Sequence, residues 1–407
     1  MARYIHLTNC LLADNSQLKK DDLFIDTILG IIIEKPEGGF ESKDIEVIDL
    51  NGNIVSPGFI DIQINGCFGL DFSTTFTEEK QRLEFVQEYN DSMEKLLNYG
   101  VTSICPTVTS SFSDVYNDVL HILGLKTRSP TKADSLGVHI EGPFLSPQKK
   151  GCHPPETLAV MKDGYESLFE RYGRDFEKYA AIVTAAPEVE GCLEVISEIT
   201  KNNQVVFSIG HTMSDFDTGL QAIQKGATMM THLYNAMPAY TARNVGVVGL
   251  ISATKDELPS EKIPYYGLVA DGIHVHPSAI KAAYDANPNK AILVTDAMSL
   301  IGLEDGIYKR GNQTVEKKGH LLHLEGTEII AGSATYLLDC VHNLIKWTEI
   351  PIQNALATIT NNPARSLNIS KRKGFLNPGC DADFNILTKT GELKQVYKLG
   401  LKAHSFE

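Results

Sequence analysis

Hydrophobic and polar positions alternate between two patterns in the central part of this 407-residue chain. Between residues 57 and 365, short apolar runs of strand length are separated by longer segments with the apolar spacing of helices. Strands that alternate with helices pair in parallel, so eight such runs predict a closed (β/α)8 TIM barrel, an α/β fold. The expected strands are residues 59–65, 101–108, 136–140, 180–185, 204–209, 227–231, 265–270 and 291–295.

Four intervening segments have a clear helical pattern, at residues 78–99, 113–126, 188–202 and 215–225. The first is followed by Gly100, which suits the left-handed position that often ends a helix.

Both ends of the chain have the texture of β-structure. Residues 4–8 and 22–26 alternate in polarity, residues 28–33 are rich in β-branched side chains, and residues 379–387 and 395–399 match them. We therefore expect one small β-sandwich domain, built from residues 1–56 and 366–407, beside a barrel of residues 57–365.

Composition narrows the classes of function. The chain is 43% hydrophobic and 22% charged, as in ordinary globular proteins. Its net charge of -14 argues against nucleic acid and against anionic membrane as partners. The seven cysteines form no CxxC, and no signal peptide or apolar run of membrane length is present, so we expect a cytoplasmic protein with reduced thiols.

Charged and imidazole side chains follow three of the predicted strands. Glu141 ends the strand at 136–140, and His211 and His232 follow the strands at 204–209 and 227–231. Each residue alone has an ordinary structural interpretation, as a carboxylate paired with a lysine or as a hydrogen-bonded histidine. At the rim of one barrel, however, they form a two-histidine, one-carboxylate set that suits zinc or another divalent first-row metal and leaves a position open for water.

Asp296 follows the eighth strand in the same way. It suits a further metal ligand, the N-cap of the next helix, or a proton carrier. With the metal set in place we favour a general base and acid, which takes a proton from water and gives it to the leaving group.

Other polar residues lie in the loops beyond these strands. Arg243, in a glycine-bearing loop, suits either a surface salt bridge or a clamp for an anionic substrate. Asn235 offers a polar contact near the metal, and either His274 or His276 could line the pocket or face solvent. Cys152 has no neighbouring base that would mark it as a nucleophile.

The order of these segments resembles the N-acetylglucosamine-6-phosphate deacetylases of the amidohydrolase superfamily, over nearly the whole chain. Short motifs such as Gly-His-Thr are weak individually, but the ordered set is specific. The matching segments are Ser-Pro-Gly-Phe-Ile-Asp from Ser56, His-Ile-Glu-Gly-Pro-Phe from His139, Lys-Gly-Cys-His from Lys150, Gly-His-Thr from Gly210, Thr-His-Leu-Tyr-Asn-Ala-Met from Thr231, Asp-Gly-Ile-His from Asp271, Thr-Asp-Ala-Met from Thr295 and Asn-Pro-Gly-Cys-Asp-Ala-Asp from Asn377.

The resemblance implies a role for each matching residue. Glu141, His211 and His232 would bind the metal, and Asp296 would be the catalytic acid and base. His153 would contact the substrate and polarise its acetyl carbonyl. The resemblance also implies a homodimer, in which a phosphate contact can come from the neighbouring subunit. The remaining substrate contacts would come from Cys152 (through its backbone), Asn235, Ala236, Arg243, His274, and Ile330, Ala331 and Gly332 in a loop before Ser333.

The chain departs from many amidohydrolases at the end of the first strand. Where they carry His-x-His and hold two metals, this chain has Gln63-Ile64-Asn65. Neutral amides are weak zinc ligands, so we expect one divalent ion per chain, zinc first, with iron, cobalt or manganese also compatible. Gln63 and Asn65 would hydrogen-bond the water or fill the vacant site.

The expected reaction is removal of the N-acetyl group from N-acetylglucosamine 6-phosphate, a small phosphorylated amino sugar. A second hypothesis is hydrolysis of a cyclic amide or nucleobase, which Arg243 and Asn235 argue against because such substrates need no phosphate clamp. A third is a metal-free scaffold without activity. The joint presence of Glu141, two histidines and Asp296 argues against that.

Overall fold

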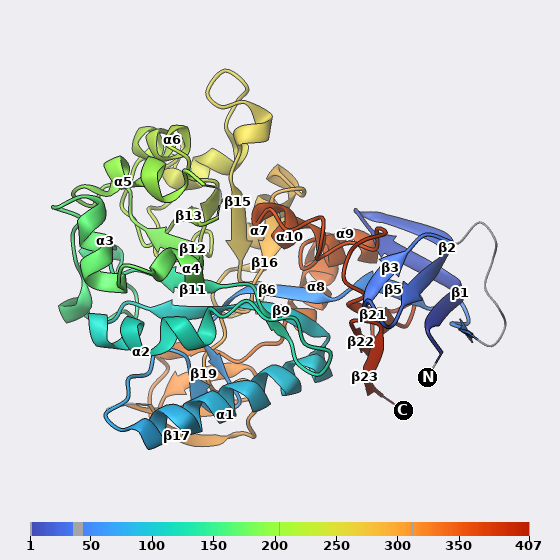
Figure 1. Cartoon of the computed structure of the whole chain (residues 1–407). Coiled ribbons are helices and arrows are strands. Elements are labelled where there is room, and N and C mark those ends of the chain that lie inside the picture. The colour runs from blue at the N-terminus through green and yellow to red at the C-terminus, as the bar shows by residue number, and fades with distance from the viewer. Residues whose placement is uncertain (1, 36–43, 203, 311–312, 407) are drawn as a thin grey trace.

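The computed structural model describes residues 2–35, 44–202, 204–310 and 313–406 and contains the predicted barrel (Figure 1). Its strands pair in parallel around the ring, in the order of the chain, and helices surround them, which confirms the TIM-barrel prediction. The eight strands are β6 (Phe59–Ile64), β9 (Val101–Thr109), β11 (Val138–Glu141), β12 (Ala180–Ala185), β13 (Val206–Ile209), β14 (Met229–Met230), β15 (Tyr265–Leu268) and β16 (Ala291–Leu293). A short strand, β10 (Asp134–Ser135), pairs with the start of β9.

The ring closes loosely between its first and last strands. In the described residues, the only β-bridge between β6 and the segment after β16 is an isolated one, Ile64 to Ala297. Two backbone hydrogen bonds join these segments, from Asp296 N to Gln63 O (2.9 Å) and from Asn65 N to Ala297 O (2.8 Å). The loop that carries Asp296 is therefore attached directly to the end of β6.

The four predicted helices are present but shorter than expected, the third most of all. Gly100 follows the first helix and its terminal 3-10 turn (Leu97–Tyr99) in the predicted way, with a φ of 76°. The predicted helices correspond to α1 (Glu79–Leu96), α2 (Ser113–Leu123), α5 (Cys192–Ile199) and α6 (Phe216–Gln224). The structure adds α3 (Tyr165–Tyr172), α4 (Phe176–Tyr179), α7 (Pro277–Ala286), α8 (Leu337–Thr348), α9 (Ile352–Ala357) and α10 (Asn361–Ser366). No helix in the described ranges is long and apolar enough to cross a membrane.

Both chain ends contribute to one small β domain at the side of the barrel, where blue and red strands lie together (Figure 1). Its eight strands form a single hydrogen-bonded sheet, and β5 joins the two ends by pairing antiparallel with β21. The exact domain limits, 1–56 and 366–407 against 57–365, stay a prediction. The strands are β1 (Tyr4–Asp14), β2 (Gln17–Asp26), β3 (Ile31–Ile33), β4 (Ile45–Asp49), β5 (Ile54–Pro57), β21 (Phe384–Leu387), β22 (Leu393–Lys398) and β23 (Leu401–Ser405).

A four-stranded antiparallel sheet between β16 and α8 was not anticipated. It corrects one prediction, because Ile330, Ala331 and Gly332 lie in a strand and not in a loop. That strand is hydrogen-bonded antiparallel to β19. The alternation of polar and apolar residues in this segment did not predict the pairing. The strands are β17 (Gly306–Arg310), β18 (Gln313–Lys318), β19 (Leu321–Leu324) and β20 (Ile330–Ser333).

The interior of the barrel beneath the rim is polar. The His139 ring bonds Ile62 O (3.0 Å) and the Thr184 hydroxyl (2.7 Å), and Thr184 bonds the Thr231 hydroxyl (2.6 Å). Ser208 continues the chain to Thr231 at 2.6 Å. Strands β6, β11, β12, β13 and β14 are thereby linked just below their carboxyl ends, where the predicted site residues lie.

Candidate active site

Three predicted metal ligands from three strands meet at the rim of the barrel. Oε1 of Glu141 lies 3.0 Å from Nε2 of His232 and 3.3 Å from Nε2 of His211. The two histidine nitrogens are 3.0 Å apart. All three side chains are buried, so the cluster is shielded from bulk water.

The backbone turns these side chains inward at a conformational cost. His211 has a φ of 48°, His232 of 28° and Asp296 of 47°, all in the left-handed region. Such values are uncommon for residues other than glycine and cost of order 1–3 kcal/mol each, and they cluster where a surrounding structure holds a functional group in place. At all three positions a left-handed residue comes two or three residues after the strand ends.

The hydrogen bonds of His211 make its Nε2 an acceptor. Nδ1 lies 2.8 Å from the carbonyl oxygen of Lys149, which can only accept, so Nδ1 carries the proton. The lone pair on Nε2 then faces the Glu141 carboxylate. Two acceptors this close repel each other unless a cation lies between them, so the donor set fits a divalent metal ion.

The charge of Glu141 agrees with this arrangement. Burial raises the pKa of its carboxyl, but the hydrogen bonds and positive charge of His211 and His232, when these are protonated, outweigh burial and hold the pKa well below its ordinary value. A metal ion bound between the neutral imidazoles and Glu141 would supply positive charge at the same place. Glu141 is therefore an anionic ligand at neutral pH.

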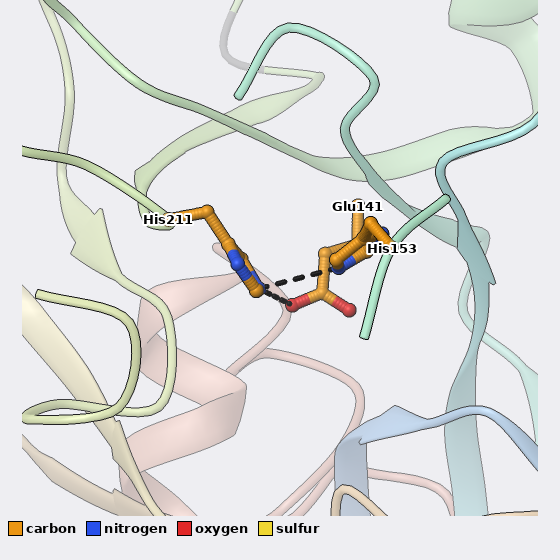
Figure 2. Close-up of side chains that lie close together, drawn as sticks. All are labelled: Glu141, His153 and His211. Atoms are coloured by element: carbon orange, nitrogen blue, oxygen red, sulfur yellow. Dashed lines mark hydrogen bonds and ion pairs between the residues drawn. The ribbon is translucent and has the colours of Figure 1, made fainter. Parts of the chain in front are cut away.

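The His153 side chain converges on Glu141 and His211 (Figure 2). The backbone N–H of Ser110 donates to His153 Nδ1 (3.1 Å), which places the imidazole proton on Nε2. That nitrogen lies 3.3 Å from His211 Nε2. Burial and the neighbouring His211 lower the pKa of His153 to about 3, so it is a neutral donor aimed at the centre.

The two amides at the end of β6 donate to the carboxylates of the site. Gln63 Nε2 donates to Glu141 Oε1 (3.0 Å), and Asn65 Nδ2 donates to Asp296 Oδ1 (2.8 Å). Burial and the negative charge of Glu141 raise the pKa of Asp296 above its ordinary value. A carboxyl with a raised pKa, held by one oxygen, is suited to moving a proton near neutral pH.

The sequence and the fold are both similar to those of known proteins. The amidohydrolase family model matches residues 54–402. The N-acetylglucosamine-6-phosphate deacetylase of Caenorhabditis elegans is 38% identical over 97% of this chain and 93% of its own. The human enzyme of the same name is 36% identical over 98% and 95%. The crystal structure of the Pasteurella multocida enzyme superimposes with a TM-score of 0.83 at 25% identity, over 99% of this chain and 100% of its own.

The chain belongs to the amidohydrolase family. Within it, the chain groups with the N-acetylglucosamine-6-phosphate deacetylases, and it is an enzyme of that hydrolase class. Amidohydrolases depend on metal ions, which agrees with the convergence of Glu141, His211 and His232.

Two histidines whose position the sequence left open are distinguished by their partners. His276 is the N-cap of α7, where its Nδ1 accepts from the backbone N–H of Ser278 (3.2 Å). His274 Nδ1 bonds Asp271 Oδ2 at 2.7 Å. Burial lowers the pKa of His274, but Asp271 more than offsets it, and the charge of Asp296 adds to the rise. From the sequence, Asp271 was named only as the start of a matching segment and was given no role, although it lies three residues before His274.

Three of the other predicted substrate contacts, Asn235, Ala236 and Gly332, lie on segments next to those that carry the site residues. Asn235 and Ala236 come three and four residues after His232, and Ala236 O accepts from the N–H of Thr212 (3.1 Å). A Cβ on Gly332 would lie 2.5 Å from Met298, so β20 packs against the loop that follows Asp296.

Cys152 is exposed on the loop that carries His153. Arg243 is also exposed, and no contact joins it to the metal-ligand cluster among the described residues.

Proposed function

We propose that this chain hydrolyses the N-acetyl group of N-acetylglucosamine 6-phosphate, which gives glucosamine 6-phosphate and acetate. The convergence of two acceptors, Glu141 and His211, beside a raised-pKa carboxyl and a neutral imidazole donor carries the proposal. The names of the relatives supply the substrate class.

Glu141, His211 and His232 would hold one divalent ion, with zinc, iron, cobalt and manganese all compatible with this donor set. When bound, such an ion lowers the pKa of water and polarises a carbonyl oxygen. The residues of the chain supply the remaining chemistry.

Asp296 accepts the proton of the attacking water on the carboxylate oxygen that Asn65 does not bind. The water oxygen forms a bond to the acetyl carbon, and His153 Nε2–H donates to the acetyl oxygen as negative charge develops there. Asp296 then returns the proton to the sugar nitrogen as the C–N bond breaks.

Recognition of the phosphate is assigned to Arg243 and His274. Arg243 makes no ion pair or side-chain hydrogen bond to any described residue, so its guanidinium is available to an anion. In a chain of net charge -14, a phosphorylated sugar needs such a local cation. A homodimer that shares this contact, and a cytoplasmic location, stay predictions.

Acetate release is the direct test. Purified protein, stripped with a chelator and reloaded with each metal in turn, is assayed with N-acetylglucosamine 6-phosphate, with unphosphorylated N-acetylglucosamine and with a cyclic amide. We expect metal-dependent acetate release and a strong preference for the phosphorylated sugar. Ring opening of the cyclic amide without acetate release would contradict the proposal, and a protein that binds no metal would point to a scaffold.

A further inference from the structure

Asp61 is a buried carboxylate with no part in the proposed reaction. It lies in β6, two residues before Gln63, and is 1% exposed. Among the described residues no lysine, arginine or histidine pairs with it, and burial raises its pKa to about 7. A buried carboxylate without a cation is costly, so packing alone does not explain an aspartate at this position.

The hydrogen bonds of Asp61 reach the residue that precedes Asp296. The Thr295 hydroxyl donates to Asp61 Oδ2 at 2.6 Å, and the Thr295 N–H lies 3.4 Å from Oδ1. The same hydroxyl oxygen accepts from the N–H of Ala297 at 3.2 Å. The residues on both sides of Asp296 are thus tied to one buried pair, Asp61 and Thr295.

This pair braces a strained segment where the barrel is loosely closed. Asp296 has a φ of 47°, and its N–H is held by Gln63 O at 2.9 Å. Strained residues keep their conformation only where surrounding contacts over-determine it. Among the described residues the two strand ends share one isolated bridge, Ile64 to Ala297, and two backbone hydrogen bonds in place of a continuous ladder, so side-chain contacts add to that restraint.

We propose that Asp61, acting through the Thr295 hydroxyl, is a positioning residue that holds the Asp296 carboxylate at the reacting centre. The inference rests on the proposed function, because it assigns Asp61 to the proton transfer by Asp296. Asp61 does not touch the substrate. It restrains the backbone of Asp296, the residue that transfers the proton. A small displacement of such a catalytic group lowers the rate strongly.

Thr295→Val removes the hydroxyl and keeps the shape, and Thr295→Ser keeps the hydroxyl. We expect Thr295→Val to lower kcat for N-acetylglucosamine 6-phosphate by on the order of 10- to 100-fold, the cost of a catalytic group displaced by up to about 1 Å. KM and bound metal should stay close to wild type, since the ligands and the phosphate contacts are untouched. Thr295→Ser should restore most of kcat.

Thr358→Val is the matched control. Thr358 is also fully buried, but its hydroxyl donates to Ala355 O at 2.6 Å and not to a residue that holds the Asp296 segment. It should lower the melting temperature without changing kcat. If Thr295→Val also lowers only the melting temperature, the Thr295–Asp61 bond merely closes the barrel and the inference is wrong.

Asp61→Asn provides a second, independent variant. It should lower kcat in the same direction, and the double variant Asp61→Asn with Thr295→Val should lose little more than the worse single variant, because both changes break one bond. Multiplied losses would overturn the coupling between the two residues. A wild-type enzyme that releases no acetate would instead refute the proposed function, so the two failures are distinguishable.

Discussion

Two buried clusters of potential metal ligands lie at opposite ends of the barrel and differ in how their charges are balanced. At the carboxyl ends of the strands, Glu141 meets imidazole groups that have no permanent positive charge. Near the amino ends of the strands, the carboxylates of Asp134, Asp381 and Asp383 converge as closely, but lysine side chains of the same chain pair with them.

Two buried lysines neutralise this second cluster, which we call the basal cluster and define as Asp134, Asp381, Asp383, Lys373 and Lys398. Lys373 Nζ forms ion pairs with all three carboxylates, at 2.5 Å to Asp134 and 2.9 Å to Asp381. Lys398 Nζ lies 2.9 Å from Asp134 and 3.1 Å from Asp383.

The comparison teaches that ligand atoms in proximity do not make a metal site. The basal cluster joins the barrel residue Asp134 to Asp383 and Lys398 near the chain end, so its lysines connect the barrel to the small β domain. The rim cluster contains no lysine or arginine. Burial lowers the pKa of His232, but Glu141 raises it to about 9, and a metal ion bound by the neutral imidazoles would take the place of that proton. Charge balance, more than distance, separates a structural network from a catalytic one.

The largest effect is expected from a change that disrupts the rim cluster and leaves the basal cluster intact. His211→Ala should remove both bound metal and acetate release, because it deletes one of three ligands. Lys373→Met is the matched change in the basal cluster. It leaves buried carboxylates uncompensated and should cost about 3–5 kcal/mol of stability while the folded protein keeps its metal. Elemental analysis with thermal unfolding separates the two, and equal metal loss in both variants would refute the distinction.

The next largest effect is expected from Asp296→Asn. This variant separates the role of the metal ligands at the rim from the role of the residue that transfers the proton. The change keeps the shape of the side chain and removes the base. We expect bound metal to persist and kcat to fall by on the order of 10² to 10⁴, the usual contribution of general acid-base catalysis. Steady-state kinetics with metal analysis provides the measurement. Near-wild-type turnover would leave Asp296 as a structural residue and sink the mechanism.

Local pattern predicted the strands and their terminal residues well, because both follow from short-range periodicity. Glu141 and His211 could be placed at one rim since the carboxyl ends of parallel strands share an edge. The hydrogen bonds that decide their chemistry were not predictable, since the backbone groups of Ser110 and Lys149 leave no mark in the residue pattern.

The ion pairs between residues far apart in the chain were also not predictable from the sequence. Lys373 is 239 residues from Asp134, and no local signal joins them. The sheet at 306–333 was missed because two of its strands, Gly306–Arg310 and Gln313–Lys318, are rich in charged side chains and the other two are only four residues long. Its packing against Met298 depends on tertiary contact that periodicity does not encode.

Arg243→Ala tests a third kind of cation, exposed and without a carboxylate partner in the described chain. A charged hydrogen bond is worth about 1.5–3 kcal/mol, so KM for the phosphorylated sugar should rise by about one to two powers of ten. Activity on unphosphorylated N-acetylglucosamine should barely change. If a partner subunit supplies Arg243, mixing these chains with Asp296→Asn chains should restore activity, and no recovery would place the clamp within one chain.

The smallest expected effect concerns the pH dependence of the basal cluster. Burial raises the pKa of Asp383, but Lys373 and Lys398 outweigh it and lower the pKa from 3.8 to about 2. A carboxyl with a depressed folded-state pKa adds stability above its unfolded pKa, and that stability is lost as the pH falls from about 4 toward 2. The contribution is roughly 2–3 kcal/mol. Urea unfolding at a series of pH values measures it.

Asp383→Asn isolates this contribution from the acid sensitivity of the rim. The variant is less stable than wild type at pH 7, but its stability should fall less steeply between pH 4 and 2, because an amide does not titrate. Protonation of Glu141 and the rim histidines affects both proteins equally and cancels in the difference. Parallel curves would mean that the lysines do not hold the Asp383 pKa down. The charge balance that separates the basal cluster from the rim would then have to reside in Asp134 and Asp381.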